Sequence, residues 1–356
     1  MKKFLTAAFA LCMTVCMSLA ALAAEPGEAN ITAQTTIREL RANPAIQGSG
    51  YYTYCNEWSE TDTRYLDNTL ESYVGGAMAD DAAEGLNLVV ENYNNGVQVT
   101  WQVYSPEQIA QEPVLGKVQL YYYPAKTPNA KFAVVLSGNG GATTSEIGEG
   151  ASAAYQLHEA GYAAFVLRYR SFLNGSDNAP LKDLGSAVKF VEDHAEQFGV
   201  QKENYALVGF SSGGQICGLF GSDRPYGYKA YGVPQPAALL LGYPINDFAE
   251  VKPVYHILMD PLDVDWRYYW TNLSYVVNEN YTPIFFWNGK NDVFYKRMGY
   301  CLQAPPLKRA LEKYNVPFEY HEYEDAPHVS GTGKGTDAEG WVQRAAAFWE
   351  EQTKTA

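Results

Sequence analysis

From residue 131 to the C-terminus, apolar runs alternate with helix-like segments, and this alternation restricts the possible folds more than any other feature. The apolar runs include KFAVVLSG, YAAFVLRYR, YALVGF, PAALLLGYPI and TPIFFWNG. Because these runs are nearly continuous, they are typical of strands that are buried on both faces. Such strands belong to a mostly parallel sheet that helices cover on both sides. We therefore predict an α/β fold with its active site at the carboxyl ends of the strands.

A different pattern precedes this region. Residues 97–104 (VQVTWQVY) and 116–124 (GKVQLYYYP) alternate with period two, which predicts two strands forming an antiparallel edge of the sheet. Residues 51–94 show apolar residues at a weak helical spacing. We divide the chain into an N-terminal extension of unknown role, residues 25–96, and a main domain, residues 97–356.

The first residues have the pattern of a secretory signal. Two lysines precede an apolar run over residues 4–22, and small residues follow it. This pattern predicts a signal peptide over residues 1–24. A membrane anchor is the alternative, because the run is just long enough to span a bilayer, but Glu25 and Pro26 after the small residues favour cleavage. We expect a bacterial protein, secreted or held in the cell envelope, without stable membrane association.

Charge and cysteine content exclude some classes of partner and structure. The net charge of −14 argues against nucleic acids and anionic membranes, because binding phosphate groups requires a basic surface. Outside the predicted signal, three cysteines remain. An odd number excludes a complete set of disulfides and allows at most one. Cys55 and Cys301 are the candidate pair, whereas Cys217 lies in an apolar segment and is predicted to be a small core residue.

The segment GFSSGG, residues 209–214, places two serines among three glycines where a strand-like run meets a helix-like run. Its first five residues fit G-x-S-x-G in the context in which this pattern forms a nucleophile elbow. Small residues must flank the serine there, because the turn is sharp. We therefore predict that Ser211 is a nucleophile; an ordinary glycine-rich turn is the alternative.

A serine hydroxyl needs a base to become nucleophilic, and the base needs an acid that orients it. In this type of fold the partners follow the serine in the order acid, then histidine. Of the five histidines, His328 fits this order, because it follows the last predicted strand on the glycine-rich loop of YEDAPHVSGTG. His321 is the rival, but the alternation around it places it inside a strand.

Asp292 is the predicted acid. It follows the strand TPIFFWNG in a short loop and precedes His328 in the chain. Asp247, which follows the preceding strand, is the alternative acid. Asp325 is closer to His328 in sequence but is predicted to lie on a surface loop. This assignment rests on chain order and on placement in loops at strand ends.

The negative charge that develops on the substrate oxygen needs hydrogen-bond donors. The backbone N–H of Ser212, directly after the nucleophile, is predicted to be one of them. A second donor is expected from the loop after KFAVVLSG, where SGNGG contains glycines that let backbone N–H groups turn inward. We assign this role to Asn139 and Gly140; a plain glycine loop is the alternative.

About two thirds of the chain, from Lys117 on, resembles the α/β-hydrolase fold, and most of all bacterial esterases related to hormone-sensitive lipase and to acetyl-xylan and feruloyl esterases. The resemblance rests on VVLSGNGG, GYAAFVLRYR, APLKDLGSAVKFV, VGFSSGGQI, TPIFFWNGKNDV and EDAPHVSGTG. It implies an acyl-serine mechanism without a metal or organic cofactor. It also implies that Ser211, His328 and Asp292 are nucleophile, base and acid.

Some details go with this resemblance and some depart from it. Arg170 and Asp183, in the matching stretches, are predicted to form a structural pair. The oxyanion loop of such enzymes usually begins with His or Pro before three glycines, but here Ser137 stands first and an asparagine interrupts the glycines. The extension has no counterpart in the resemblance.

Residues 248–281 form an aromatic-rich, cap-like insertion between two predicted strands. Its segment DWRYYW supplies candidates for one wall of the substrate pocket: Trp266, Tyr269 and Trp270. The alternative is an aromatic seam that packs the insertion on the core, because aromatic side chains serve both purposes.

Together these features predict a secreted serine carboxylic-ester hydrolase that acts on small-molecule or polysaccharide esters, such as acetyl or feruloyl esters of plant polysaccharide. A serine peptidase of the prolyl-oligopeptidase type is one alternative, but we would expect it to carry a larger N-terminal domain than residues 25–96 supply. A non-catalytic binding protein with the same fold is the other, and the complete set of catalytic residue types argues against it.

Overall fold

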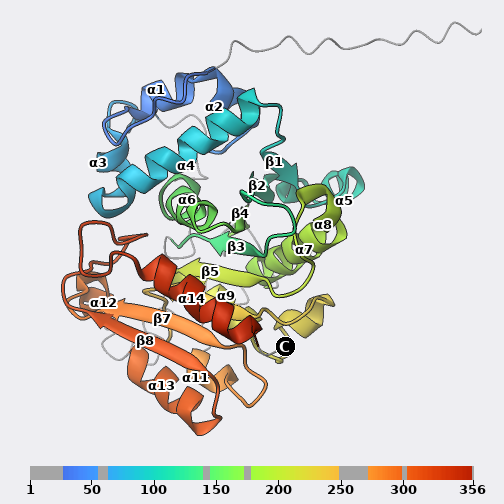
Figure 1. Ribbon diagram of the computed structural model, residues 1–356, viewed down its shortest axis with the longest axis vertical. Coiled ribbons are helices and arrows are strands. Elements are labelled where there is room, and N and C mark those ends of the chain that lie inside the picture. Colours follow the sequence, from blue (N-terminus) through green and yellow to red (C-terminus); the bar gives the residue numbers. More distant parts are fainter. Residues whose placement is uncertain are drawn as a thin grey trace, which may run out of the picture.

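The computed structural model describes residues 27–54, 63–138, 145–171, 178–247, 272–298 and 303–354. One eight-stranded sheet, with strand order β1-β2-β4-β3-β5-β6-β7-β8, runs through the molecule (Figure 1). The strands are β1 (Thr100–Gln102), β2 (Gln119–Tyr123), β3 (Phe132–Leu136), β4 (Ala163–Arg168), β5 (Ala206–Phe210), β6 (Ala238–Gly242), β7 (Ile284–Gly289) and β8 (Phe318–Tyr323). Strands β3 to β8 are parallel, whereas β1 and β2 form an antiparallel edge next to β4. The predicted sheet is therefore confirmed.

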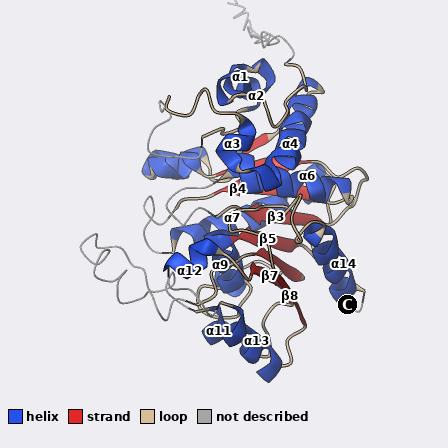
Figure 2. Cartoon of the chain, turned by 90° about the vertical axis from the view of Figure 1, so that its left-hand side faces the viewer, coloured by secondary structure: helices blue, strands red, loops and turns tan. Residues whose placement is uncertain are grey.

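Helices cover both faces of this sheet (Figure 2). On one face α6 (Ala151–Glu159) and α14 (Trp341–Thr353) contact each other, and on the other α7 (Ala179–Asp193) contacts α9 (Ser211–Phe220). The remaining α-helices are α1 (Ile37–Ala42), α2 (Pro44–Ser49), α3 (Leu70–Val74), α4 (Gly76–Asn94), α5 (Pro106–Gln111), α8 (Ala195–Phe198), α11 (Leu273–Val276), α12 (Val293–Met298) and α13 (Ala304–Lys313). Shorter 3₁₀ turns are η1 (Pro113–Lys117) and η3 (Tyr228–Tyr231), and η2 (Glu146–Gly150) is a π-helical turn.

The apolar runs form the central strands because both of their faces are covered. Every residue of β3, β5, β6 and β7 is buried. Burying one large apolar side chain contributes about 1.5–3 kcal/mol to folding. Strand β8, at the far edge, is only half-buried, and polar residues interrupt its apolar ones. A continuous apolar run therefore indicates a central strand, and a mixed run indicates an edge strand.

The N-terminal extension is helical and packs on α6. Helices α1 to α4 lie together at one end of the molecule, beside α6 (Figure 1). The contact is close, because a Cβ added to Gly85 of α4 would lie 2.4 Å from the carbonyl oxygen of Ala151. Leu86 and Val89 of α4 are wholly buried. The extension is thus joined to the same hydrophobic core as the helices that cover the sheet.

The predicted pair of Arg170 and Asp183 forms. The Arg170 guanidinium Nη2 donates to Asp183 Oδ1 at 2.8 Å, and both side chains are buried. The Arg170 backbone N–H also donates to Asp183 Oδ2 at 2.8 Å. Because Arg170 follows β4 and Asp183 belongs to α7, the pair joins the end of a central strand to the helix that covers it.

Several other predictions lie partly or wholly outside the described residues. The predicted signal peptide and both members of the candidate disulfide, Cys55 and Cys301, are among them. Cys217 is a buried free thiol, as expected of a small core residue, and burial raises the pKa of this thiol. Within the described ranges, no helix has the length and apolar character that crossing a bilayer requires.

Candidate active site

The turn between β5 and α9 holds Ser211 in a strained conformation. Strand β5 ends at Phe210 and α9 begins at Ser211, whose φ of 50° lies in the left-handed region. A non-glycine residue adopts this region at an energetic cost, and such strain concentrates at functional sites. A Cβ on Gly213 would lie 2.4 Å from the carbonyl oxygen of Leu136, so only glycine fits there. This is the geometry of a nucleophile elbow.

Ser211, His328 and Asp292 form a hydrogen-bonded chain. Ser211 Oγ lies 2.9 Å from His328 Nε2, and His328 Nδ1 lies 2.7 Å from Asp292 Oδ2. The three residues follow β5, β8 and β7, at the carboxyl ends of parallel strands. A carboxylate can only accept, so His328 Nδ1 donates to Asp292 and the neutral Nε2 accepts the Ser211 hydroxyl proton. This is the arrangement in which a histidine acts as base toward a serine.

Both members of the Asp292–His328 pair are held in place. The backbone N–H of Tyr295 donates to Asp292 Oδ1 at 3.1 Å, so both carboxylate oxygens of Asp292 have a donor. The Phe294 ring stacks on the His328 ring at 4.3 Å, and the Tyr243 ring lies 4.9 Å away. The side chains of Asp292 and His328 are 1% and 7% exposed. The imidazole therefore has a fixed orientation and little water around it.

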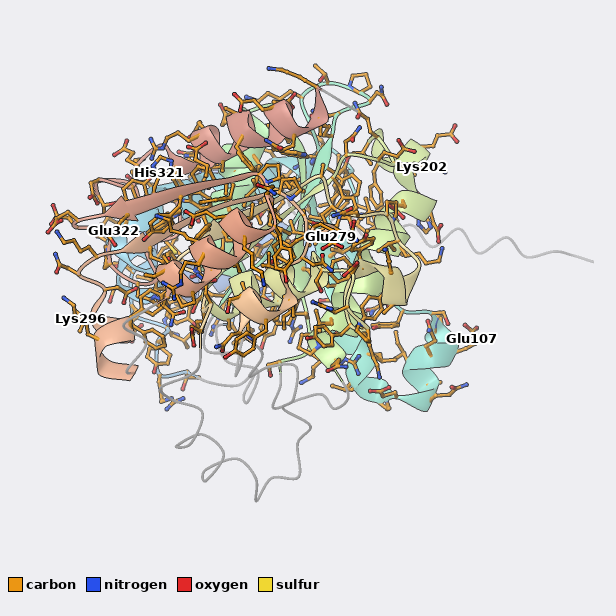
Figure 3. The ribbon with its side chains drawn as sticks, turned by 90° about the horizontal axis from the view of Figure 1, so that it is seen from below. Glu107, Lys202, Glu279, Lys296, His321 and Glu322 are labelled. Atoms are coloured by element: carbon orange, nitrogen blue, oxygen red, sulfur yellow. The ribbon has the colours of Figure 1, made fainter. Side chains whose placement is uncertain are left out.

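The structure places the rival residues elsewhere. His321 lies on the edge strand β8, where its Nε2 pairs with Glu319 Oε1 at 2.6 Å (Figure 3). Asp247 Oδ1 accepts a hydrogen bond from Asn272 Nδ2 at 2.8 Å. Asp325 is exposed, and its backbone N–H donates to Asp337. Of the predicted candidates, the structure brings Asp292 and His328 to Ser211 and leaves these three apart.

The predicted oxyanion residues are described only in part. Asn139 and Gly140 lie outside the described residues, as do all three aromatic pocket candidates, Trp266, Tyr269 and Trp270. Ser212 is buried in the first turn of α9, where backbone N–H groups have no acceptor within the helix. A Cβ on Gly138 would lie 2.6 Å from Ser211 Cβ, so the loop after β3 starts directly beside the serine.

Two buried residues near the site were missed by the sequence analysis. Glu149 Oε2 accepts from the Gly138 N–H at 2.6 Å, and Glu149 Oε1 accepts from the Tyr243 hydroxyl at 2.7 Å. The Tyr243 hydroxyl in turn accepts from the Gly331 N–H at 2.8 Å. The only signal in the sequence is that Glu149 lies in EIGEGASAA, a segment whose other residues, apart from Glu146, are mostly small or apolar. This pattern does not indicate a partner for the glutamate.

A second carboxylate reaches the histidine loop from the N-terminal extension. Asp81 of α4 is buried, and its Oδ2 accepts from Thr332 Oγ1 at 2.6 Å and from Gln156 Nε2 at 2.9 Å. The Lys334 backbone N–H donates to the carbonyl of Ala77 at 2.9 Å. The extension therefore contacts the loop that carries His328 a few residues beyond the histidine.

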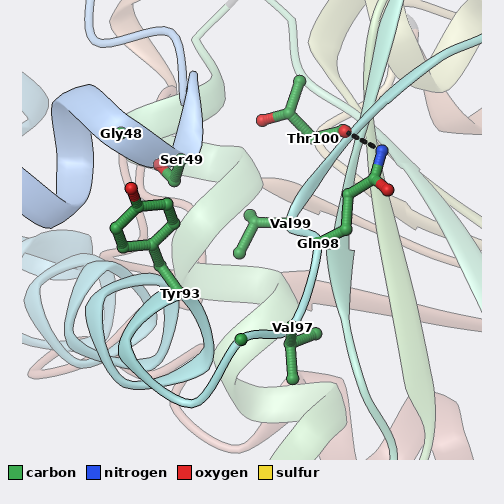
Figure 4. Close-up of a pocket in the computed structure, with 8 residues that line it drawn as sticks. Gly48, Ser49, Tyr93, Val97, Gln98, Val99 and Thr100 are labelled. Carbon is green, nitrogen blue, oxygen red and sulfur yellow. Dashed lines mark hydrogen bonds between the residues drawn. The ribbon is translucent and has the colours of Figure 1, made fainter. Parts of the chain in front are cut away.

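One hollow in the described part of the chain is separate from this site. A cavity of about 320 Å³ lies between α2, the end of α4 and β1, where Ser49, Tyr93, Gln98 and Thr100 line it (Figure 4). None of the lining residues belongs to the hydrogen-bonded chain at Ser211. Among the described residues, no group of three or more His, Cys, Asp or Glu side chains is arranged to hold a metal ion.

Esterases are among the known proteins to which this chain is similar. A protein-family model described as BD-FAE matches residues 119–226. An acetylxylan esterase of Xylanibacter ruminicola is 27% identical over 135 residues, which are 38% of this chain and 27% of the relative. The endo-1,4-beta-xylanase B of Butyrivibrio fibrisolvens is 25% identical over 207 residues, covering 54% of this chain and 31% of that protein. The chain thus spans less than a third of the length of these curated relatives.

Solved structures show the fold. An acetyl ester-xyloside bifunctional hydrolase from Caldicellulosiruptor lactoaceticus has a TM-score of 0.56 at 21% identity, covering 71% of this chain and 95% of its own. A carboxylesterase from Lactobacillus plantarum has a TM-score of 0.55 at 21% identity, covering 66% of this chain and 92% of its own. The chain therefore has the α/β-hydrolase fold, and over residues 119–226 it is similar to the esterase family that the BD-FAE model describes.

Proposed function

We propose that this protein is a serine carboxylesterase. The single observation that carries the proposal is the hydrogen-bonded chain from Ser211 through His328 to Asp292, at the carboxyl ends of three parallel strands. The strained turn at Ser211 supports it, because the turn places the serine at the carboxyl ends of the strands, where substrates bind in this architecture. The similarity to carboxylesterases supports the same reaction class.

In the proposed mechanism, Ser211 Oγ attacks the ester carbonyl carbon while His328 Nε2 takes the hydroxyl proton. Asp292 holds the imidazole and stabilises its positive charge without itself becoming protonated. His328 then gives the proton to the leaving alcohol, and the acyl group remains on Ser211. Water, deprotonated by His328, attacks the acyl-serine and releases the acid, which regenerates the free serine.

We assign the stabilisation of the oxyanion to backbone N–H groups. Ser212 supplies one from the N-terminus of α9, where the helix dipole also favours negative charge. The loop after β3 supplies the others, and Asn139 and Gly140 remain our candidates there. Support comes from Gly138, the described residue of that loop, which lies against Ser211.

We further propose that the substrates are acetyl or feruloyl esters carried by plant polysaccharide. The printed names of two similar proteins, an acetylxylan esterase and an acetyl ester-xyloside hydrolase, support an acetylated xylan-type substrate. Export through a signal peptide at residues 1–24 would place the enzyme with such a polymer. Trp266, Tyr269 and Trp270 are proposed to form one wall of the site, since aromatic rings pack well on sugars and on aromatic acids.

The test is ester hydrolysis by the wild type and a Ser211→Ala variant. Substrates are a chain-length series of p-nitrophenyl esters, methyl ferulate and acetylated xylan, and a fluorophosphonate probe reports a reactive serine independently of substrate choice. We expect labelling and turnover by the wild type and a loss of turnover on the order of 10⁶-fold in Ser211→Ala. Ser72→Ala, at an exposed serine of α3, is the control that should keep both.

Two outcomes would overturn the proposal. Absence of labelling in folded wild-type protein would favour a non-catalytic binding protein on this fold. Labelling with turnover of aminoacyl-nitroanilides, and none of any ester, would favour a serine peptidase. The preference among the cleaved esters decides between acetyl and feruloyl groups.

A further inference from the structure

One buried carboxylate beside the site has no part in the mechanism above. Glu149 belongs to the π-helical turn η2, directly before α6, and is 1% exposed. Its side chain is buried, and within the described ranges its carboxylate accepts from no lysine or arginine. Instead it accepts hydrogen bonds from two donors that belong to loops of the active site. A buried charge without a basic partner is costly to keep, so its contacts must supply the compensation.

The contacts of Glu149 join three loops at the carboxyl edge of the sheet. Through Oε2 it binds the N–H of Gly138, the residue after β3 that lies against Ser211. Through Oε1 it binds the hydroxyl of Tyr243, the residue directly after β6. That hydroxyl accepts the N–H of Gly331, three residues beyond His328. One carboxylate therefore fixes the start of the oxyanion loop and, through Tyr243, the histidine loop.

The two hydrogen bonds favour the charged form of Glu149 and oppose the effect of its burial. The Tyr243 oxygen accepts from Gly331, so its own proton is free to point to Glu149 Oε1, while the Gly138 N–H points to Oε2. Two donors, one at each oxygen of a carboxyl group, favour its ionised form. Burial raises the pKa of Glu149, and the two donors and the charge of His328 oppose this shift.

The charge of Glu149 also acts on His328. The groups that face the imidazole are Asp292 after β7, Ser211 on α9, the phenols of Tyr295 and Tyr243, and behind Tyr243 the Glu149 carboxylate. Of these, Asp292 and Glu149 are carboxyl groups. A negative charge near the ring favours the imidazolium form, which arises in the reaction when His328 takes the serine proton.

We propose that Glu149 is a positioning residue of the esterase reaction: as a carboxylate it holds Gly138 against Ser211, fixes the histidine loop through Tyr243, and favours the imidazolium of His328. This inference rests on the proposed esterase function. It assigns Glu149 no contact with substrate. Its effect should appear mainly in the transition state, because both the oxyanion and the imidazolium exist only there.

The chain supplies a matched control in the same turn. Glu146 is also 1% exposed and lies three residues before Glu149. Burial raises the pKa of the Tyr51 and Tyr121 phenols, and the nearby charge of Glu146 adds to this shift. Glu146→Gln and Glu149→Gln are therefore the same change at the same burial, and Glu149 is the one whose carboxylate binds Gly138 and Tyr243.

The experiment measures kcat and KM for p-nitrophenyl acetate across pH 5–9, together with thermal unfolding, for the wild type and both Gln variants. For Glu149→Gln we expect kcat to fall about 10- to 100-fold with KM nearly unchanged, a smaller loss than removing an oxyanion donor outright. The apparent pKa of the acid limb in the plot of kcat against pH should also fall, because removing the carboxylate disfavours protonated His328. Glu146→Gln should keep kcat and the acid limb even where it lowers the melting temperature.

Each result bears on one of the two proposals. If the wild type neither binds fluorophosphonate nor cleaves esters, the esterase function fails and this inference falls with it. If the wild type is active and Glu149→Gln keeps its kcat and acid limb, or changes them no more than Glu146→Gln does, the role of Glu149 alone is overturned. If Glu149→Gln does not fold, Tyr243→Phe decides: it removes only the linking hydroxyl and keeps the carboxylate, so we expect a lower kcat with the acid limb kept. An unchanged kcat would overturn the proposed positioning.

Discussion

The loop that carries His328 is held from two sides, and the two sides differ in kind. On the hydrolase side, charged and polar groups form a continuous chain to the histidine ring itself, from Asp292 to Ser211. On the side of the N-terminal extension, Asp81 and the Ala77 carbonyl bind the loop four to six residues later, at Thr332 and Lys334. The first side contains the residues that we propose to react, and the second, among the described residues, contacts the part of the loop that follows His328.

This difference suits the two sides to two roles: the hydrolase side to the proposed chemistry, and the extension to support of the loop. The hydrolase side uses a proton acceptor, a nucleophile and an acid in hydrogen-bond reach of one another, which is what proton transfer requires. The extension uses apolar packing and one buried carboxylate, which restrict where the loop can lie. A Cβ on Gly331 would lie 2.8 Å from Met78 Cβ, so the extension packs directly against the loop backbone. We infer that substitutions on the hydrolase side should lower the catalytic rate more than the stability. Substitutions in the extension should lower the stability more than the rate.

The largest effect should come from the acid of the hydrolase side. Asp292→Asn keeps the volume but replaces an acceptor of the His328 Nδ1 proton with a group that can donate, which favours the wrong tautomer. We expect kcat for p-nitrophenyl acetate to fall roughly 10⁴-fold, with little change in melting temperature. Asp247→Asn is the matched change at the rival carboxylate, which bonds Asn272, and should keep most of the activity. The reverse ranking of these two variants would move the acid to Asp247.

A smaller effect should come from the extension, where we expect the stability to change more than the rate. Asp81→Ala leaves the Thr332 hydroxyl and the Gln156 amide without their acceptor in a buried place. We expect the free energy of unfolding to fall by about 1–3 kcal/mol and kcat to fall by less than about tenfold, measured by chemical denaturation and steady-state kinetics.

The neighbouring carboxylate provides the control for this variant. Asp80 is exposed and lies 3.2 Å from Lys334 Nζ at the surface. An exposed pair contributes little, so Asp80→Ala should change the free energy of unfolding by less than about 1 kcal/mol. If Asp81→Ala lost as much activity as Asp292→Asn while staying folded, the division between chemistry and support would be wrong.

The smallest effect is expected at a carboxyl group that belongs to neither side. Burial raises the pKa of Glu192, on α7, to about 7. A carboxyl group with a raised pKa in the folded state contributes stability below its unfolded pKa and loses it as pH rises through the folded value. Glu192→Gln should therefore raise the melting temperature at pH 8 and leave it nearly unchanged at pH 4.

The same substitution at an exposed position calibrates this measurement. Glu196→Gln, on α8, changes the net charge equally but at the surface. Its melting temperature should follow that of the wild type at both pH values. Equal shifts for Glu192→Gln and Glu196→Gln would show that net charge, and not the burial of Glu192, is responsible.

Local sequence patterns and the order of strands and loops along the chain made much of the fold and the site predictable. Strands β3, β5, β6 and β7 were predictable because burial on both faces leaves a continuous apolar run in the sequence. The turn at Ser211 was predictable because its steric demands are local, and small residues must surround it. Asp292 and His328 were predictable because strand order in this fold fixes which loops meet.

The supporting contacts could not be predicted in the same way. Glu149 and Tyr243 are 94 residues apart, and Thr332 is 251 residues from Asp81. Nothing in EIGEGASAA distinguishes Glu149, which faces the active site, from Glu146, which faces two tyrosines. Both would be expected at the surface from composition alone, since charged side chains are rarely buried without a partner.

By itself, the sequence determined the sheet, the strained turn and the candidate residues at the strand ends, because these depend on local patterning and on chain order. Only the tertiary structure decided that Asp292 rather than Asp247 meets His328, that Glu149 joins three loops, and that the extension braces the histidine loop. The physical reason is that a buried carboxylate is stable only where distant segments supply its donors, and which segments meet is settled by packing.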